Sequence, residues 1–459
     1  MYILRLLLLF FLAFISLLFT DSLSVIVIFL LLFFLGRQTV VFFQKDTSTQ
    51  DAIFIFETTY MLSFVYALSC FWFMTSNGYD HLQSFDGINV YIPYTQELLS
   101  VNSFSDLLSD IYTTSKYAFV GSILIPFVYI GKLSAMMDGE LYVVIQLTIM
   151  LFASWTAVVI YNILQINNIQ NKQAVIYTLV YALLSIHFYM STFIVRDMPI
   201  ALFFTLLIYL SFKSFTLKQF LLMIILVISI GSIRISSGIF ASLYIFLILY
   251  ISYKQGNSLK KVVTLIALVA VTIIALIYID SIISIFKLKM SQYQNIQLAK
   301  GDSAIAAFNI LPPGIKHIIK ALYIQFMPIP SWRTLVESSF RPESYNIMNF
   351  PVISATFFRY MMWFVIFIGI LHRKTRSILL NNKILIYNFI IAILYISLLS
   401  NNMAHRRLLA VYPIFFLTAI LIYERFDTKT KQILFFTVSI IFIFLQTIGL
   451  SSILQINLR

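Results

Sequence analysis

Long apolar runs recur from one end of this chain to the other, and they constrain its fold more than any other feature. Each run of roughly 17–25 residues is long enough to cross a hydrocarbon core of about 30 Å as a helix. Of the 459 residues, 61% are hydrophobic and 11% are charged, whereas a soluble domain has about a quarter charged residues. We therefore expect an all-α, polytopic membrane bundle that occupies residues 1–459 as a single domain.

Hydropathy predicts about thirteen membrane-spanning helices in this bundle. They lie near 2–20, 23–43, 52–75, 140–166, 173–193, 198–212, 219–232, 236–253, 262–286, 352–371, 384–400, 408–423 and 432–452. The first run resembles a signal peptide, but no small-residue cleavage site follows it and a second apolar run begins at once. We interpret it as a retained span.

Basic residues in four short loops predict the orientation of the chain. Alternating the spans from residue 173 onward places all four loops on one side, which the positive-inside rule makes cytoplasmic. The net charge of +13 is dispersed among short loops, so nucleic acid is not expected as a partner. The four loops carry Lys213 and Lys218; Lys254, Lys260 and Lys261; Arg373, Lys374, Arg376 and Lys383; and Arg425, Lys429 and Lys431.

Two long polar loops then fall on the outer side, at 76–116 and 287–351. Between them, the apolar segment 117–133 would invert every later span if it crossed the membrane. We predict that it is a re-entrant or interfacial helix broken at Pro126; a misplaced span elsewhere is the alternative. The second loop contains an amphipathic helix near 315–326, which either presents basic residues to lipid phosphates or packs as a cover over the bundle.

Arginines gather at the outer ends of the predicted spans, where positive-inside bias does not place them. Arginine binds phosphate in a planar, bidentate manner, so several together predict a clamp for phosphate or diphosphate. Each one alone is equally compatible with an interfacial anchor that snorkels to lipid headgroups. The candidates are Arg196, Arg234, Arg359, Arg406 and Arg407.

Four further residues are candidates for a catalytic base. Asp80 and Asp86 lie in the first outer loop, where an aspartate is either a turn residue or a proton acceptor. Asp197 precedes Met198–Pro199 and either caps the following helix, has a functional role, or does both while it pairs with an arginine. His405 adjoins two arginines, whose charge favours its neutral, proton-accepting form. No residue spacing predicts a zinc site, a glycine-rich phosphate loop or a nucleophile motif.

These segments together resemble the polytopic GT-C glycosyltransferases and the bacterial O-antigen or capsule repeat-unit polymerases. The resemblance covers the order of motifs from about residue 52 onward. It differs from the usual pattern in two extra N-terminal spans and in the absence of an acidic pair directly after the first family span. The motifs are Asp86–Gly87, Tyr189–Met190–Ser191–Thr192–Phe193–Ile194–Val195–Arg196–Asp197–Met198–Pro199, Gly231–Ser232–Ile233–Arg234, and Asn401–Asn402–Met403–Ala404–His405–Arg406–Arg407 before Tyr412–Pro413.

The resemblance implies a GT-C-like enzyme of the bacterial inner membrane that polymerises polyprenyl-diphosphate-linked repeat units on the outer face. Asp80 or Asp86 would match the first-loop acid and Asp197 the second, with Arg196, Arg234, Arg406 and Arg407 as phosphate binders. The implied partners are a polyprenyl-linked glycan donor and acceptor, the bilayer and, as a further candidate, a chain-length regulator. The resemblance implies no particular cofactor, and a divalent cation is compatible with it. The alternatives are a single-sugar transferase using a polyprenyl-phosphate-sugar donor, and a flippase of lipid-linked oligosaccharide.

Overall fold

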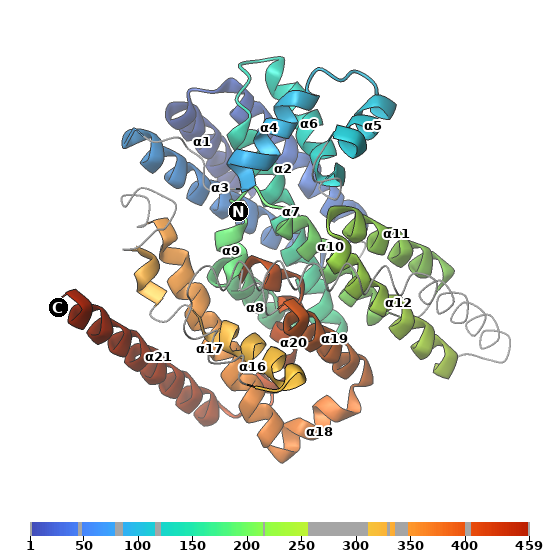
Figure 1. Ribbon diagram of the computed structural model, residues 1–459, viewed down its shortest axis with the longest axis vertical. Coiled ribbons are helices and arrows are strands. Elements are labelled where there is room, and N and C mark those ends of the chain that lie inside the picture. The colour runs from blue at the N-terminus through green and yellow to red at the C-terminus, as the bar shows by residue number, and fades with distance from the viewer. Residues whose placement is uncertain are drawn as a thin grey trace.

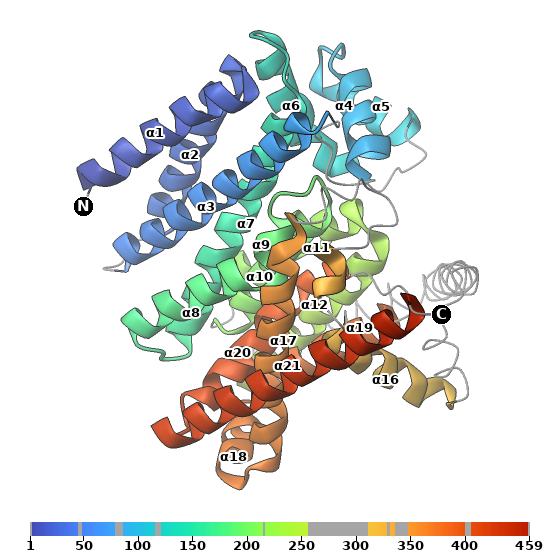
Figure 2. The ribbon, with the colours of Figure 1, turned by 90° about the vertical axis from the view of Figure 1, so that its left-hand side faces the viewer.

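Helices form every regular element in the part of the chain that the structure describes (Figures 1 and 2). The computed structural model describes residues 2–44, 48–78, 86–114, 121–213, 216–255, 311–327, 331–335, 348–399 and 405–457. The predicted all-α class is therefore confirmed for these residues. The predicted span at 262–286, Asp80 and most of the 287–351 loop lie outside them.

The helix boundaries follow the predicted apolar runs closely. The helices are α1 Tyr2–Thr20, α2 Leu23–Phe43, α3 Thr49–Ser76, η1 Gly87–Tyr91, α4 Ile92–Leu98, α5 Phe104–Thr114, α6 Gly121–Ala135, α7 Tyr142–Ile166, α8 Asn171–Leu184, α9 Ile186–Met190, α10 Asp197–Ser211, α11 Leu217–Ile233, α12 Ile235–Gln255, α16 Pro313–Phe326, η3 Ser331–Leu335, α17 Phe350–Leu371, α18 Arg373–Asn381, α19 Lys383–Leu399, η5 His405–Ala410, α20 Tyr412–Tyr423 and α21 Thr428–Asn457.

Five of the described helices are long and apolar enough to cross a membrane: α2, α3, α7, α17 and Thr428–Ile448 within α21. A sixth candidate is the bent pair formed by α18 and α19. Several other predicted spans are shorter apolar helices, among them α10, α11 and α20, and some runs are divided. The run at 173–193, for example, is interrupted at Ser185, whose side chain caps α9 by accepting from the His187 backbone N–H. The structure is that of a helical membrane protein, and the count of thirteen spans is not confirmed.

Helix α7 lies at the centre of the N-terminal half (Figure 1). In its most apolar window 89% of the residues are buried, as expected for a helix that is apolar on all sides, and it contacts α2, α3, α8 and α10. Gly36 of α2 permits a close crossing, since a Cβ there would lie 2.3 Å from Phe56 Cζ and 2.6 Å from Leu151 Cδ1. Helix α21 runs along the periphery (Figure 2), and only 11% of its window is buried.

The segment predicted to be the first outer loop contains η1, α4 and α5, and α6 follows it. Helix α6 continues through Pro126, so the predicted break at this residue is absent. A proline removes one backbone donor from a helix, but α6 is held by its contacts with α4, α5 and α7. In addition, Phe127 of α6 packs against Tyr91 of η1. The re-entrant or interfacial position of this helix remains a prediction.

Helix α16 corresponds to the amphipathic helix expected near 315–326. It packs against α17 and α19. Lys320 and Ile324 are buried, whereas the apolar side chains of Ile315 and Ile318 are 53% and 47% exposed. Because a basic residue faces the protein and two isoleucines face outward, the helix matches the covering alternative better than a basic face toward lipid phosphates.

Candidate functional site

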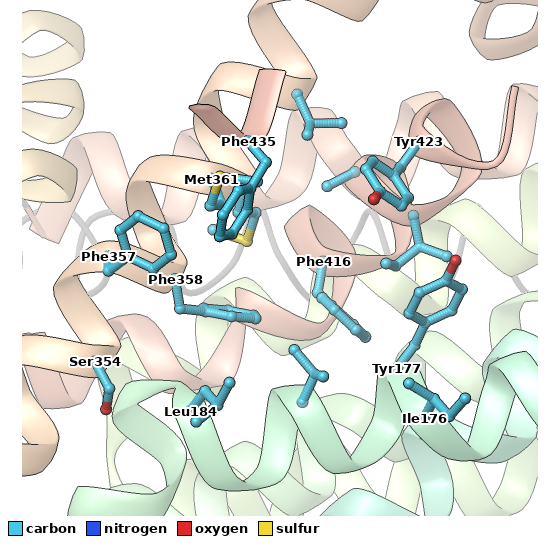
Figure 3. A pocket seen from close by; sticks show the side chains of 15 residues that line it. Ile176, Tyr177, Leu184, Ser354, Phe357, Phe358, Met361, Phe416, Tyr423 and Phe435 are labelled. Atoms are coloured by element: carbon cyan, nitrogen blue, oxygen red, sulfur yellow. The ribbon is translucent and has the colours of Figure 1, made fainter. Parts of the chain in front are cut away.

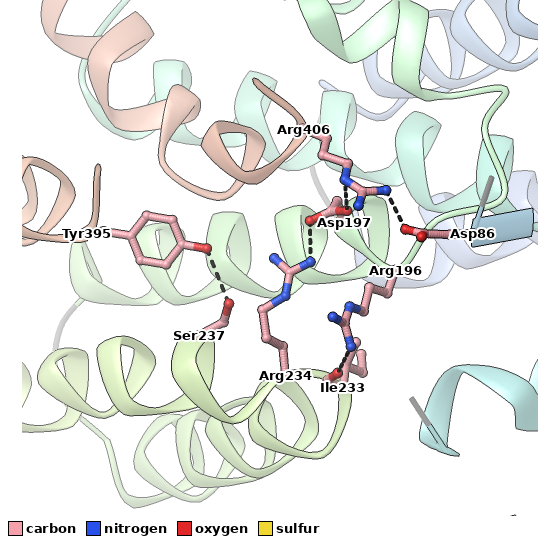
Figure 4. Close-up of polar contacts among 8 residues, drawn as sticks. All are labelled: Asp86, Arg196, Asp197, Ile233, Arg234, Ser237, Tyr395 and Arg406. Atoms are coloured by element: carbon pink, nitrogen blue, oxygen red, sulfur yellow. Dashed lines mark hydrogen bonds and ion pairs between the residues drawn. The ribbon is translucent and has the colours of Figure 1, made fainter. Parts of the chain in front are cut away.

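Charged side chains from four segments that are distant in sequence meet at one place (Figure 4). Asp86 immediately precedes η1, Arg196 and Asp197 begin α10, Arg234 separates α11 from α12, and Arg406 belongs to η5. The contact between Asp86 and Arg406 joins residues 320 positions apart. We call the six residues Asp86, Arg196, Asp197, Arg234, Arg406 and Arg407 the arginine cluster.

Asp197 and Arg234 form the buried centre of the arginine cluster. Arg234 Nη2 donates to Asp197 Oδ1 at 2.6 Å, and the two side chains are 7% and 2% exposed. Asp197 is the first residue of α10, while the N-cap position is Arg196, which makes no side-chain cap hydrogen bond. Asp197 therefore does not occupy the cap position of α10, and its side chain pairs with Arg234.

Arg234 is positioned by the corner between α11 and α12. It ends α11 in an extended conformation, and its carbonyl accepts from the Gly238 N–H at 3.0 Å. A Cβ on Gly238 would lie 2.5 Å from the Cα of Gly231, which is a steric overlap. Glycine at 238 therefore allows the two helices to approach closely at the corner from which Arg234 reaches Asp197.

Arg406 connects the buried centre to a more accessible layer. Its Nη1 donates to Asp86 Oδ2 at 2.5 Å, and its Nε lies 3.6 Å from Asp197 Oδ2. The side chains of Arg406 and Asp86 are 31% and 33% exposed, in contrast to Asp197. The accessible carboxylate at this site is thus Asp86, and its present partner is an arginine.

Arg196 and Arg407 complete the arginine cluster. Arg196 Nη1 donates to the Ile233 carbonyl at 3.4 Å, beside the corner that carries Arg234. Arg407 is buried and lies close enough to Asp197 to interact with it electrostatically. The four arginines outnumber the two aspartates, so the arginine cluster carries an excess of two positive charges.

Two tyrosines adjoin the arginine cluster: Tyr91 follows the candidate Asp86 in the first polar loop, whereas Tyr395 was not a candidate from the sequence. The Tyr395 hydroxyl of α19 lies 3.2 Å from Ser237 Oγ of α12 (Figure 4). Tyr91 at the end of η1 is buried, and this burial raises the pKa of its phenol to about 12. Nearby arginines lower this pKa and nearby aspartates raise it, each by less than burial does. Tyr91 is therefore a neutral phenol. Tyr395 lies within an apolar run, where only its polar tip distinguishes it from a lipid-facing aromatic residue.

The remaining candidates lie elsewhere or outside the described residues. Arg359 is fully buried in α17, and its Nη2 donates to the Met327 carbonyl at 2.5 Å and to Thr356 Oγ1 at 3.0 Å. The bond to Met327 ties α17 to the end of α16, while the bond to Thr356 lies within α17, and both indicate a structural role. His405 begins η5, but its side chain lies outside the described part, as does all of Asp80.

The buried centre has unused hydrogen-bonding capacity. Within the described residues, neither Nε nor Nη1 of Arg234 has a hydrogen-bond partner. Buried polar groups are usually bonded, so these two donors are suited to a ligand oxygen. No group of three His, Cys, Asp or Glu side chains arranged for a metal ion occurs in the described ranges; participation of a divalent cation remains a prediction.

Comparisons with models of protein families, with curated protein sequences and with solved structures give no match to this chain. The chemistry of the arginine cluster is therefore the main basis for a functional proposal.

Proposed function

We propose that this chain is a GT-C-like glycosyltransferase of a bacterial inner membrane. It polymerises polyprenyl-diphosphate-linked oligosaccharide repeat units on the outer face, as the sequence resemblance implies. The observation that carries the proposal is the convergence of four arginines and two aspartates from four distant segments. Charge at membrane depth is costly, so charged residues there usually mark a functional site. This arrangement of arginines suits an anionic substrate.

The excess of two positive charges supports a diphosphate rather than a monophosphate donor. A sugar diphosphate diester carries two negative charges and a monophosphate diester carries one. Binding the diphosphate would bring the arginine cluster to neutrality. When the glycosidic bond breaks, the departing diphosphate gains a further negative charge, which preorganised arginines stabilise in the transition state. The two open donors of Arg234 are suited to contact these oxygens.

Asp86 is the proposed general base. The acceptor hydroxyl gives its proton to the Asp86 carboxylate, its oxygen bonds to the anomeric carbon, and the polyprenyl diphosphate leaves with the electron pair of the broken bond. For this to occur, Arg406 must exchange Asp86 for a phosphate oxygen of the donor. Asp197 is buried against Arg234 and acts as a positioning residue that orients the guanidinium.

The class of activity is tested by the glycans that accumulate in cells without this chain. A polymerase predicts single lipid-linked repeat units displayed on the outer face. A flippase predicts the same units retained on the cytoplasmic face, and a single-sugar transferase predicts repeat units that lack one sugar. Either of the last two results would contradict the proposal.

A further inference from the structure

A second buried charged group joins the first three helices. Glu57 of α3 has a side chain that is only 6% exposed, and both of its oxygens are paired. Its Oε2 lies 3.0 Å from Arg5 Nη1 of α1, and its Oε1 lies 3.2 Å from Arg37 Nε of α2. Two guanidinium groups share one carboxylate, so these three side chains together bear two positive charges and one negative charge.

All three residues lie at one level of the helix bundle. Arg5 lies near the start of α1, Arg37 near the end of α2 and Glu57 near the start of α3. Since α2 runs antiparallel to α1 and α3, this level lies toward the side predicted to be cytoplasmic. A guanidinium in the low dielectric of a bilayer is unfavourable without an anion beside it, and the Arg5 side chain, 31% exposed, can accept a second anion at this level.

An apolar cleft of about 360 Å³ extends from this charged group between α1 and α3. Arg5, Leu8 and Leu12 line one wall, and their spacing places them on one face of α1. The other wall is formed by α3, including Leu62 and Val65. The cleft thus joins a cationic end to an apolar channel, which are the two features that a lipid with an anionic headgroup requires.

A larger apolar groove elsewhere provides a contrast. It has a volume of about 380 Å³ and lies between α8, α17, α20 and α21 (Figure 3). Near Tyr423 at its edge, Glu424 accepts a hydrogen bond from Tyr177 and lies 4.0 Å from Lys431. This carboxylate and ammonium balance one another, so the charge at this groove does not select an anionic occupant.

We infer that the cleft between α1 and α3 binds an anionic phospholipid of the phosphatidylglycerol class from the cytoplasmic leaflet. Its phosphodiester lies beside Arg5 at the charged end of the cleft, where it makes a charge-assisted contact, and an acyl chain occupies the cleft along Leu8 and Leu62. This inference rests on the membrane location of the chain and does not depend on glycosyl transfer.

Native mass spectrometry of the detergent-purified protein tests the inference. The protein is incubated with equal amounts of phosphatidylglycerol and phosphatidylcholine that carry the same acyl chains. We expect the wild-type protein to retain phosphatidylglycerol over phosphatidylcholine by roughly tenfold, as one charge-assisted contact allows. Arg5→Gln should abolish this preference, and Leu62→Trp, which fills the cleft, should reduce the binding of both lipids.

Three further variants guard against misfolding as an explanation. Glu57→Gln leaves both arginines and increases the positive charge, so it should bind phosphatidylglycerol at least as well as the wild type. Arg425→Gln and Leu221→Trp change exposed residues on other helices or loops and should behave as the wild type. Unchanged phosphatidylglycerol retention in Arg5→Gln or in Leu62→Trp would overturn the inference, as would its loss in Glu57→Gln.

Discussion

Arg406 Nη1 lies 2.5 Å from Asp86 Oδ2 and links the first outer segment to η5, across 320 positions of sequence. The same guanidinium also faces Asp197. Arg406 is thus shared between an accessible and a buried carboxylate. A substrate phosphate that draws Arg406 away would release Asp86 while Arg234 remains bound to Asp197. Asp86, which can be released, is therefore the proposed base, and Asp197, which stays paired, is the proposed positioning residue.

Asp197 and Arg234 should be energetically coupled. Removing one partner leaves the other charge buried, so Arg234→Ala should lower the free energy of unfolding by about 3–5 kcal/mol. Asp197→Ala should have a similar cost, and the double variant should be less destabilised than the sum of the two. Thermal unfolding in detergent measures all three. Additive losses would mean that the two side chains do not stabilise one another.

The corner that carries Arg234 should depend on Gly238. Gly238→Ala places a Cβ where Gly231 Cα lies 2.5 Å away, so the helices must separate at a cost of about 1–3 kcal/mol. Gly231→Ala is the matched control, because its Cβ would be 3.9 Å from Gly238, an ordinary contact. We expect Gly238→Ala to lower both the melting temperature and the activity. Equal effects of the two substitutions would contradict the close approach at this corner.

Acid should weaken the connection between α2 and the turn after α6. The Asp138 carboxylate accepts from the Ser24 N–H at 3.1 Å and from Ser24 Oγ at 2.5 Å. Burial raises the pKa of Asp138, but hydrogen bonds from Ser24, Glu140 and Ser22 together lower it to about 2. A depressed pKa stabilises the fold above the ordinary value near 3.9, and this contribution is lost as the pH falls toward 2.

The melting temperature measured from pH 5 to pH 2 checks this prediction. Asp138→Asn should melt at a lower temperature than the wild type at pH 5, and the difference should narrow as the pH falls. A constant difference across the range would show that ionisation of Asp138 is not responsible.

Single cysteines should report the orientation of the chain. The native Cys70 is fully buried and should not react with a membrane-impermeant thiol reagent. Asp106→Cys, on the exposed side of α5, should react in intact cells from outside, and Lys429→Cys should react only after the membrane is opened. Both residues are exposed. The reverse pattern would place the arginine cluster on the cytoplasmic side and contradict the proposed substrate face.

The sequence predicts the helical class and most of the arginine cluster for a physical reason. Arginines at the outer ends of apolar runs are expensive and are therefore conspicuous, so Arg196, Arg234, Arg406 and Arg407 could be selected without any structure. Their pairing could not be predicted. Which aspartate meets which arginine depends on how η1, α10 and η5 come together in the fold, and periodicity within one helix contains no such information.

Tyr395 and Arg359 show two other limits of sequence reasoning. Tyr395 is indistinguishable in sequence from the many aromatic residues that face lipid, although its hydroxyl reaches Ser237 beside the arginine cluster. Arg359 has the same sequence context as the other arginines, but its guanidinium is used to join α17 to the end of α16. Likewise, a proline such as Pro126 signals a break that the packing of α6 against its neighbours overrides.

The most direct test of the proposed function is the product ladder made by the purified protein in lipid nanodiscs supplied with polyprenyl-diphosphate-linked repeat units. Wild-type protein should produce glycans of increasing length. Asp86→Asn should reduce their rate of formation by roughly 100-fold or more, and Asp106→Asn, an exposed aspartate of the same outer segment, should produce the wild-type ladder. A full ladder from Asp86→Asn would contradict the role of Asp86, and no ladder from the folded wild-type protein would contradict the proposed polymerase.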